Sequence, residues 1–296
     1  MLTQKQIDEC GPGLNQLRKP ILPLVRLAQM LYLTGPFDTF TRLLDEFTEP
    51  VETGGVSYKR PGTLLRPYLD LLEIFERIKI PRSPARILLN EQLEPMDPLD
   101  ALDSWVAQEV VKRELETINS QLCRPCNCTL CCVGPDDTLN QDFFEIPIKP
   151  EEASFFDLTR IDSPETRLTT SHDEPPLLRK KRPFYQTQSA LYHWRSGWSL
   201  ILPRHSRCPN LDPASGGCRI YPQRPDVCRR PQIFSYVLER QPDLDRAVEG
   251  KSLPAFVARK KLLAVWDCPY VQEFQEEIGG YAEQCELEPV FRKNKE

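Results

Sequence analysis

The sequence reads Cys123-Arg124-Pro125-Cys126-Asn127-Cys128-Thr129-Leu130-Cys131-Cys132 near its middle, so five of the eleven cysteines of the chain lie within ten residues. Packing of an apolar core does not require thiols at this density. Cysteines this close together serve either as disulfide partners or as soft ligands of zinc, copper or iron–sulfur clusters. We interpret this stretch as a set of metal ligands.

The start of the chain favours metal binding over disulfides. It reads Met1-Leu2-Thr3-Gln4-Lys5-Gln6 and shows no basic stretch followed by an apolar run, so we expect a cytoplasmic protein. The longest apolar stretch, residues 21–33, is interrupted by Pro23, Arg26 and Gln29, so no membrane span is expected. In a reducing compartment clustered cysteines more often bind metal than form cross-links.

The charge balance argues against a binder of polyanions. The formal net charge is −5 and the isoelectric point is about 5.5, so no nucleic-acid partner is expected. The basic run at residues 179–182 is interpreted as a solvated loop. The chain has 29 prolines and 13 glycines, which indicates many short elements with firm ends.

Residues 1–122 are predicted to form a helical layer. One apolar stripe at helical spacing consists of Leu64, Tyr68, Leu71, Phe75 and Ile78. A long helix is predicted to begin at residues 97–98, where an aspartate and a proline suit the N-cap and the first turn. Its apolar face runs along residues 111, 115, 118 and 122 and leads directly to the cysteine cluster.

The pattern changes after the cluster. Residues 143–148 resemble a strand, residues 150–156 could begin a helix, and residues 189–193 with 198–202 resemble a hairpin. Residues 160–182 are polar and predict a long surface loop. Beyond Pro254 the helical period returns, most clearly at residues 271, 274, 278 and 281.

These patterns predict an α-rich α+β fold in two regions that share a core. The helical N-terminal layer covers residues 1–122. Residues 123–296 form a cysteine-ligated metal region with few short strands and a C-terminal helix.

A second group of cysteines consists of Cys208, Cys218 and Cys228. The turn residues at 212–213 and 216–217 allow the chain to fold back between the first two. Residues 224–226 predict the start of a short helix that carries Cys228. We expect the amides at this helix start, together with Arg229 and Arg230, to lower the pKa of Cys228 and favour the thiolate.

Three segments of this region resemble a known family: Cys208-Pro-x-Leu, Cys218-x-Ile-Tyr and Arg224-Pro-x-x-Cys228-Arg, downstream of a cluster that ends in Cys131-Cys132. They resemble the YkgJ-type cysteine-cluster proteins, whose description proposes chelation of zinc or iron, and the flagellin lysine N-methylases are similar in the same segments. The resemblance covers about residues 123–232, and Cys268 is a further family-like cysteine. The family's first group reads Cys-x-x-Cys-x-x-Cys-Cys, whereas this chain has one more residue and one more cysteine. Either Cys126 or Cys128 is therefore a candidate bystander.

The spacing does not choose between zinc and iron, including a 4Fe-4S cluster, because both use four cysteines per site. Side chains of adjacent residues diverge in extended chain, so one of Cys131 and Cys132 is expected to serve a second metal or another iron. The candidate metal ligands are Cys123, Cys126, Cys128, Cys131, Cys132, Cys208, Cys218, Cys228 and Cys268.

The remaining candidate ligands are given ordinary roles. His205 is expected to face solvent or to form a hydrogen bond, although it lies three residues before Cys208. Cys10 and Cys285 lie far from both groups in sequence and are expected to be ordinary thiols that are not needed for metal binding.

No catalytic motif is present. The chain lacks G-x-S-x-G, H-E-x-x-H and the phosphate loop G-x-x-x-x-G-K-[ST], so no catalytic residue can be named and enzymatic activity is not favoured. The primary hypothesis is a zinc- or iron-chelating protein. The resemblance to flagellin methylases raises a lysine N-methyltransferase as one alternative, and an iron–sulfur electron carrier is the other.

Overall fold

The computed structural model describes the chain apart from residues 1, 77–85, 138, 231, 249–250 and 294–296. Helices dominate its N-terminal part. They are α1 (Gln4–Glu9), α2 (Gly11–Leu17), α3 (Leu22–Thr34), α4 (Phe40–Glu46), α5 (Pro61–Leu65), η1 (Arg66–Tyr68), α6 (Leu69–Phe75) and α7 (Pro98–Cys126), with a small hairpin of β1 (Val51–Thr53) and β2 (Val56–Tyr58).

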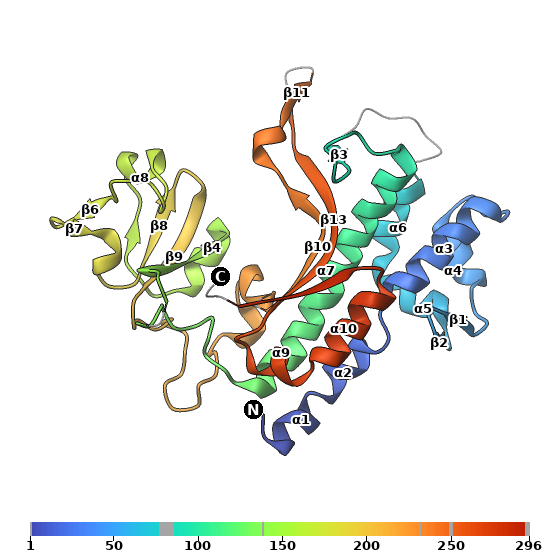
Figure 1. The fold of residues 1–296 in the computed structure, drawn as a ribbon, viewed down its shortest axis with the longest axis horizontal. Coiled ribbons are helices and arrows are strands. Elements are labelled where there is room, and N and C mark those ends of the chain that lie inside the picture. Colours follow the sequence, from blue (N-terminus) through green and yellow to red (C-terminus); the bar gives the residue numbers. More distant parts are fainter. Residues whose placement is uncertain (1, 77–85, 138, 231, 249–250, 294–296) are drawn as a thin grey trace.

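Helix α7 runs through the centre of the molecule (Figure 1). Asp97 caps its first turn by accepting from the Leu99 amide at 2.8 Å, as the sequence predicted. Its buried face includes Val111, Leu115, Ile118 and Leu122. The helix continues one turn further than the apolar stripe and ends at Cys126, so its last turn carries the first two cysteines of the cluster.

The stripe predicted from residue 64 onward is partly wrong. Leu71 and Phe75 are buried, but Leu64 is 40% exposed. The 3₁₀ segment η1 separates α5 from α6 and shifts the helical period between these residues. Ile78 lies outside the described residues.

A second sheet packs against α7. It has the order β10 (Ile233–Arg240), β13 (Ala255–Val265), β14 (Glu288–Arg292), and β3 (Ile87–Leu89) also pairs with β13. The small hairpin of β11 (Arg246–Val248) and β12 (Lys251–Leu253) and the turn η7 (Pro242–Leu244) connect β10 to β13. Helices α9 (Pro269–Glu273) and α10 (Gln275–Gln284) follow β13, which confirms the C-terminal helical pattern.

The helical period predicted beyond Pro254 is wrong as far as residue 265, because β13 occupies this stretch. The alternation typical of a strand is broken by a bulge. The register shifts between Tyr236 and Leu238, opposite Lys260, whose φ is 50°. The two strands are therefore not recognisable from a period of two.

Residues 143–203 form a separate small sheet module with the order β4-β9-β8-β5. The predicted strand is β4 (Phe143–Ile148), and the predicted hairpin is β8 (Ala190–Trp194) with β9 (Gly197–Pro203); η3 (Pro150–Phe155) forms the predicted helical turn. The expected loop at residues 160–182 is wrong. It contains β5 (Arg160–Ile161), α8 (Pro164–Leu168), β6 (Leu178–Arg179) and β7 (Arg182–Pro183), and η4 (Phe184–Gln186) follows. Pairing of β5 with β8 and the capping box at Ser163 order this segment.

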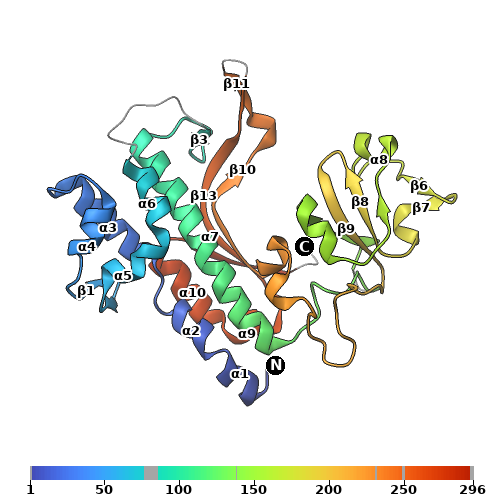
Figure 2. The same cartoon turned by 180° about the vertical axis from the view of Figure 1, so that it is seen from behind.

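The mixed α+β class, with a helical N-terminal region and a C-terminal helix, is confirmed. The largest core contains side chains from Cys10 to Leu287 and therefore joins the N-terminal helices to the C-terminal elements. Two smaller cores lie in the sheet module. Figures 1 and 2 show this module and α3 to α5 on opposite sides of α7. Among the described residues, no helix is long and apolar enough to cross a membrane.

Candidate metal centre

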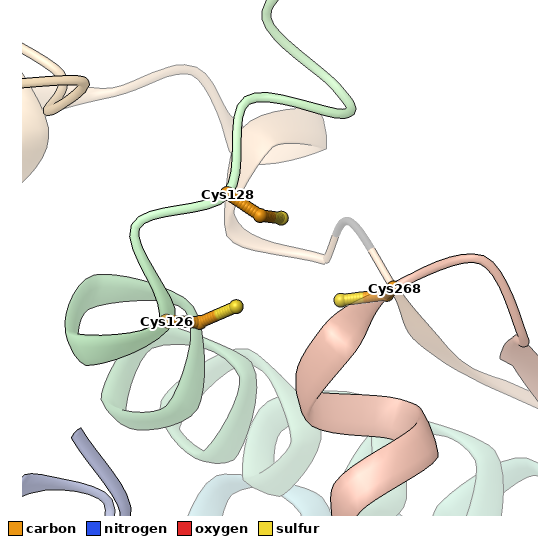
Figure 3. Close-up of side chains that lie close together, drawn as sticks. All are labelled: Cys126, Cys128 and Cys268. Carbon is orange, nitrogen blue, oxygen red and sulfur yellow. The ribbon is translucent and has the colours of Figure 1, made fainter. Parts of the chain in front are cut away.

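Three thiols meet at the C-terminal end of α7. The Sγ atoms of Cys126, Cys128 and Cys268 all lie within 4.8 Å of one another, and Figure 3 shows the three side chains pointing toward a common point. Two thiolate sulfurs that bind the same zinc ion, each at a distance of about 2.3 Å, are at most about 4.6 Å apart. The observed spacing is therefore close to that imposed by a shared ion.

The end of α7 explains why Cys126 and Cys128 face each other. Asn127 takes the left-handed conformation that ends the helix, with φ 52°, and turns the chain back on itself. Its side-chain amide donates to the carbonyl of Ser215 at 2.5 Å. Gly216 lies against this amide, with φ +70° and with Asn127 Nδ2 3.2 Å from the position of a Cβ. The turn is thus fixed by the segment between Cys208 and Cys228.

A buried asparagine brings Cys268 to the same place. Asn119 lies on α7 one turn before Cys123 and is fully buried. Its Oδ1 accepts from the Tyr270 hydroxyl at 2.6 Å and from the Ile233 amide at 3.2 Å, and its Nδ2 donates to the Ile233 carbonyl at 2.9 Å. Because Tyr270 is two residues from Cys268, this network fixes the start of α9 against α7.

Hydrogen bonds within this group of three thiols favour one thiolate. Cys126 and Cys268 both form side-chain hydrogen bonds with Cys128, and these bonds lower the pKa of Cys128 to about 3. The same contact with Cys128 is the main reason that the pKa of Cys126 rises to about 11. Contacts with Cys126 and Cys128 likewise raise the pKa of Cys268. A bound cation would take the place of the two donated protons, since metals bind thiolates.

The two distant cysteine segments lie side by side. The Cys208 amide donates to the carbonyl of Cys132 at 2.8 Å, and Val133 forms a bridge with Arg207. A further bridge joins Leu211 to Cys218. The sheet module is therefore inserted in the chain between the two cysteine segments, and the two segments lie next to each other in the fold.

The expectation that Cys131 and Cys132 point apart is wrong. Their sulfurs are 3.8 Å apart, because the Cys132 amide donates to the Thr129 carbonyl at 2.8 Å and forms a turn instead of extended chain. Contact with Cys132 lowers the pKa of Cys131, and contact with Cys131 raises that of Cys132. In this pair Cys132 acts as the donor and Cys131 as the acceptor, just as Cys126 and Cys268 are the donors to Cys128.

The expected lowering of the Cys228 pKa is also wrong. Burial, together with the neighbouring Cys131, Cys208 and Cys218, raises this pKa to about 12. The two arginines expected to lower it have other partners: Arg229 donates to the carbonyls of Arg224 and Pro222, and Arg230 pairs with Glu116. The segment η6 (Asp226–Arg229) is a single 3₁₀ turn, which follows η5 (Tyr221–Gln223).

Cys123 lies between the two groups. Burial raises its pKa to about 12, and Cys131, Cys128 and Cys126 raise it further. Cys132 in turn is close enough to Cys208 and Cys228 for both to raise its pKa. Of the nine predicted ligands, the structure brings the sulfurs of Cys126, Cys128 and Cys268 together at one point and those of Cys131 and Cys132 together as a pair. The other four thiols influence the pKa values of these cysteines or of one another.

Cys10 was not expected near this set. Its buried Sγ is 3.9 Å from the Leu122 carbonyl, and burial raises its pKa to about 11, with Cys126 raising it further. The packing of α1 and α2 against α7 creates this neighbourhood, which no sequence motif indicates. Cys285 is also fully buried, but the charged groups around it are Glu114, Arg26 and Glu286.

His205 faces solvent, as expected. Its side chain is 58% exposed and its Nε2 is 3.1 Å from Asp137 Oδ1.

Comparison with protein families agrees with this geometry. Residues 122–248 match the family model CxxCxxCC, described as a putative zinc- or iron-chelating domain. The resemblance predicted from the cysteine spacing is therefore confirmed. No curated protein and no solved structure matches the chain. The match includes eight of the nine candidate ligands, and Cys268 reaches them from outside its range through the fold alone.

Proposed function

We propose that the chain binds zinc or iron through thiolates contributed by both cysteine segments and by Cys268. The observation that carries this proposal is the convergence of Cys126, Cys128 and Cys268 within 4.8 Å, inside a region that matches a zinc- or iron-chelating family. The extra cysteine of the first segment is then a ligand, and neither Cys126 nor Cys128 is a bystander.

The chemistry of the donors supports these two metals. All eleven cysteines are free thiols, and the described residues that converge here offer sulfur instead of carboxylate oxygen. Soft thiolate ligands select zinc, copper(I) or iron–sulfur clusters over magnesium and calcium. Zinc would cross-link the segments, and an iron–sulfur cluster would in addition exchange an electron.

The second group of thiols supports more than one metal ion or a cluster of several irons. The sulfurs of Cys126, Cys128 and Cys268 would occupy three positions of a tetrahedral site and leave the fourth open. Cys123 is the neighbouring thiol that could fill this fourth position. We assign the other five to a second centre: Cys131, Cys132, Cys208, Cys218 and Cys228.

Metal analysis after anaerobic purification tests the proposal. We expect zinc or iron bound in at least stoichiometric amount, and a visible absorption spectrum distinguishes a colourless zinc protein from a brown, reducible iron–sulfur protein. A protein that binds neither metal after reconstitution, and in which the thiols of the set all react freely, would contradict the proposal.

The two alternative functions stay predictions, because no described feature tests them. A reducible chromophore is required for electron transfer. Saturable binding of labelled S-adenosylmethionine is required for methyl transfer, and its absence would remove that alternative.

A further inference from the structure

Arg224 is a buried cation beside the thiols. The residue is 5% exposed and its Nη2 donates to the hydroxyl of Ser120 on α7. The guanidinium lies over the ring of Tyr221, 4.0 Å from its centroid. The Tyr221 hydroxyl donates to the Ser120 carbonyl at 2.6 Å, so both side chains attach the second cysteine segment to α7.

No carboxylate pairs with this guanidinium among the ion pairs of the described residues. The nearest acids in sequence and on the facing helix have other partners: Asp226 pairs with Lys149 at 2.6 Å, and Glu116 pairs with Arg230 at 2.5 Å. An unpaired charge away from water is costly, and arginine cannot lose its proton to avoid the cost. The Ser120 hydroxyl and the Tyr221 ring offset part of this cost, and a nearby thiolate would offset more.

Arg224 lies next to cysteines of both segments, because its partner Ser120 is one turn before Cys123 on α7 and because Cys228 follows Arg224 by four residues. Burial raises the pKa of Cys123 and of Cys228 to about 12, and Arg224 acts in the opposite direction on both. At Cys131 the contact with Cys132 lowers the pKa most, and Arg224 lowers it further. The cation is therefore within electrostatic reach of three sulfurs that come from two distant parts of the chain.

We propose that Arg224 is a positioning residue that compensates the negative charge of the metal–thiolate centres to which Cys123, Cys131 and Cys228 belong. This inference rests on the proposed function. It adds that the loaded centre is an anion, so its thiolates outnumber the positive charges of its metal. When a divalent ion binds, each ligating thiol releases its proton to solvent, and three or four thiolates on one ion leave a net charge of −1 or −2. The fixed positive charge of Arg224 offsets part of it.

Three variants test the role of the charge: Arg224→Gln removes it, Arg224→Lys keeps it without the flat guanidinium, and Ser120→Ala removes the hydrogen-bond partner only. Zinc affinity is measured by competition with a chelator at fixed pH. We expect the glutamine variant to bind roughly 10- to 100-fold more weakly, the range for groups that support metal ligands. The lysine variant should recover most of this loss, and the alanine variant should stay near wild type.

The lysine variant separates charge from structure. A purely structural role predicts that lysine, which cannot form the same planar stack, is as damaging as glutamine, and a loss of roughly tenfold or more in Arg224→Lys would overturn the inference. Equal zinc affinity in wild type and Arg224→Gln would overturn it as well. If Arg224→Gln does not fold, the lysine and Ser120→Ala variants alone decide the question.

Failure of the proposed function gives a different result. In that case wild-type protein itself binds no zinc, and the variants need not be compared. Absorbance of the cadmium–thiolate complex provides a second readout. We expect the same number of thiolates per cadmium in wild type and Arg224→Lys, because lysine changes the surroundings of the centre and not its ligands.

Discussion

The thiol-rich junction, residues 126–134 and 204–230, is built differently from the helical core beside it. In the core, leucines and aromatic side chains from α2 to α10 pack together and are almost completely buried. In the junction, Cys131, Cys132, Cys208, Cys218 and Cys228 are only half-buried, and the chain follows turns and single 3₁₀ helices. We expect the core to be stable without metal, because its apolar side chains are almost completely buried. The junction has little apolar surface to bury, so a bound metal would contribute most of its stability.

Removal of metal should give the largest difference between these regions. We expect a strong chelator to raise amide hydrogen exchange in residues 127–134 and 206–230 strongly, because these segments bury little apolar surface and are held mainly by hydrogen bonds of turns and by single side-chain contacts. The middle of α7 and α10 should keep their protection, since their amides belong to the apolar core. Hydrogen exchange with mass spectrometry measures both, and equal loosening of the core would show that the comparison is wrong.

Two buried cysteines of the C-terminal segment sharpen the comparison. Cys268 and Cys285 are both 0% exposed, but only Cys268 faces other thiols. Cys268→Ser should lose at least one bound metal ion, whereas Cys285→Ser should keep the wild-type metal content. Metal analysis of the two purified variants decides this, and equal metal content would remove Cys268 from the ligand set.

Cys10 is a poorer control than its sequence position suggests. Cys10→Ser is still expected to keep its metal, but its closeness to Cys126 means that the variant alters the surroundings of the site. Loss of bound metal, as in Cys268→Ser, is expected for Cys131→Ser and Cys218→Ser.

The network around Asn119 should give an intermediate effect. Asn119→Ala leaves the buried Tyr270 hydroxyl and Ile233 amide without their partner, and each such group costs about 1–3 kcal/mol. Tyr270→Phe removes only one bond and should cost about 1 kcal/mol. Urea unfolding of the metal-free variants measures both. A smaller loss in Asn119→Ala than in Tyr270→Phe would contradict the assigned network.

The last prediction concerns the pH dependence of the helical core. Glu114 accepts from the Tyr281 hydroxyl at 2.8 Å and from the Ile21 amide at 3.0 Å, and burial raises its pKa from 4.5 to about 8. The folded state therefore holds a proton that the unfolded state loses above pH 4.5. Its stabilising contribution is complete below pH 4.5, decreases as pH rises and is lost above about 8, with a slope of at most about 1.4 kcal/mol per pH unit. Glu114→Gln should flatten this part of the stability curve, and an unchanged slope would assign it to another group.

Local sequence signals predicted the elements with clear punctuation. Asp97 and Pro98 marked the start of α7, and the hairpin of β8 and β9 was recognisable from two apolar runs around Gly197. The strands β10 and β13 were missed, because the bulge near Leu238 breaks their alternation and because positively charged residues interrupt β13. Contacts that depend on packing could not be predicted either.

The candidate site, like the fold, has features that the sequence predicted and features that depend on packing. The cysteine pattern and the family resemblance selected Cys126, Cys128 and Cys268, whose sulfurs meet in the structure, and the family match confirms the resemblance. The full ligand set stays a prediction. The sequence could not indicate that Asn119 fixes the segment of Cys268, that Cys10 packs against the last turns of α7, or that Arg224 bonds to Ser120 on the same helix. Each of these contacts joins parts of the chain that are far apart in sequence.

Alkylation of the cysteines, followed residue by residue by mass spectrometry with and without metal, tests the convergence of remote thiols on a shared inorganic centre most directly. We predict that metal protects Cys126, Cys128 and Cys268 together with Cys208, Cys218 and Cys228, and that a chelator exposes both groups in the same concentration range. Protection of one group alone, with the other reacting equally fast in both states, would contradict the account.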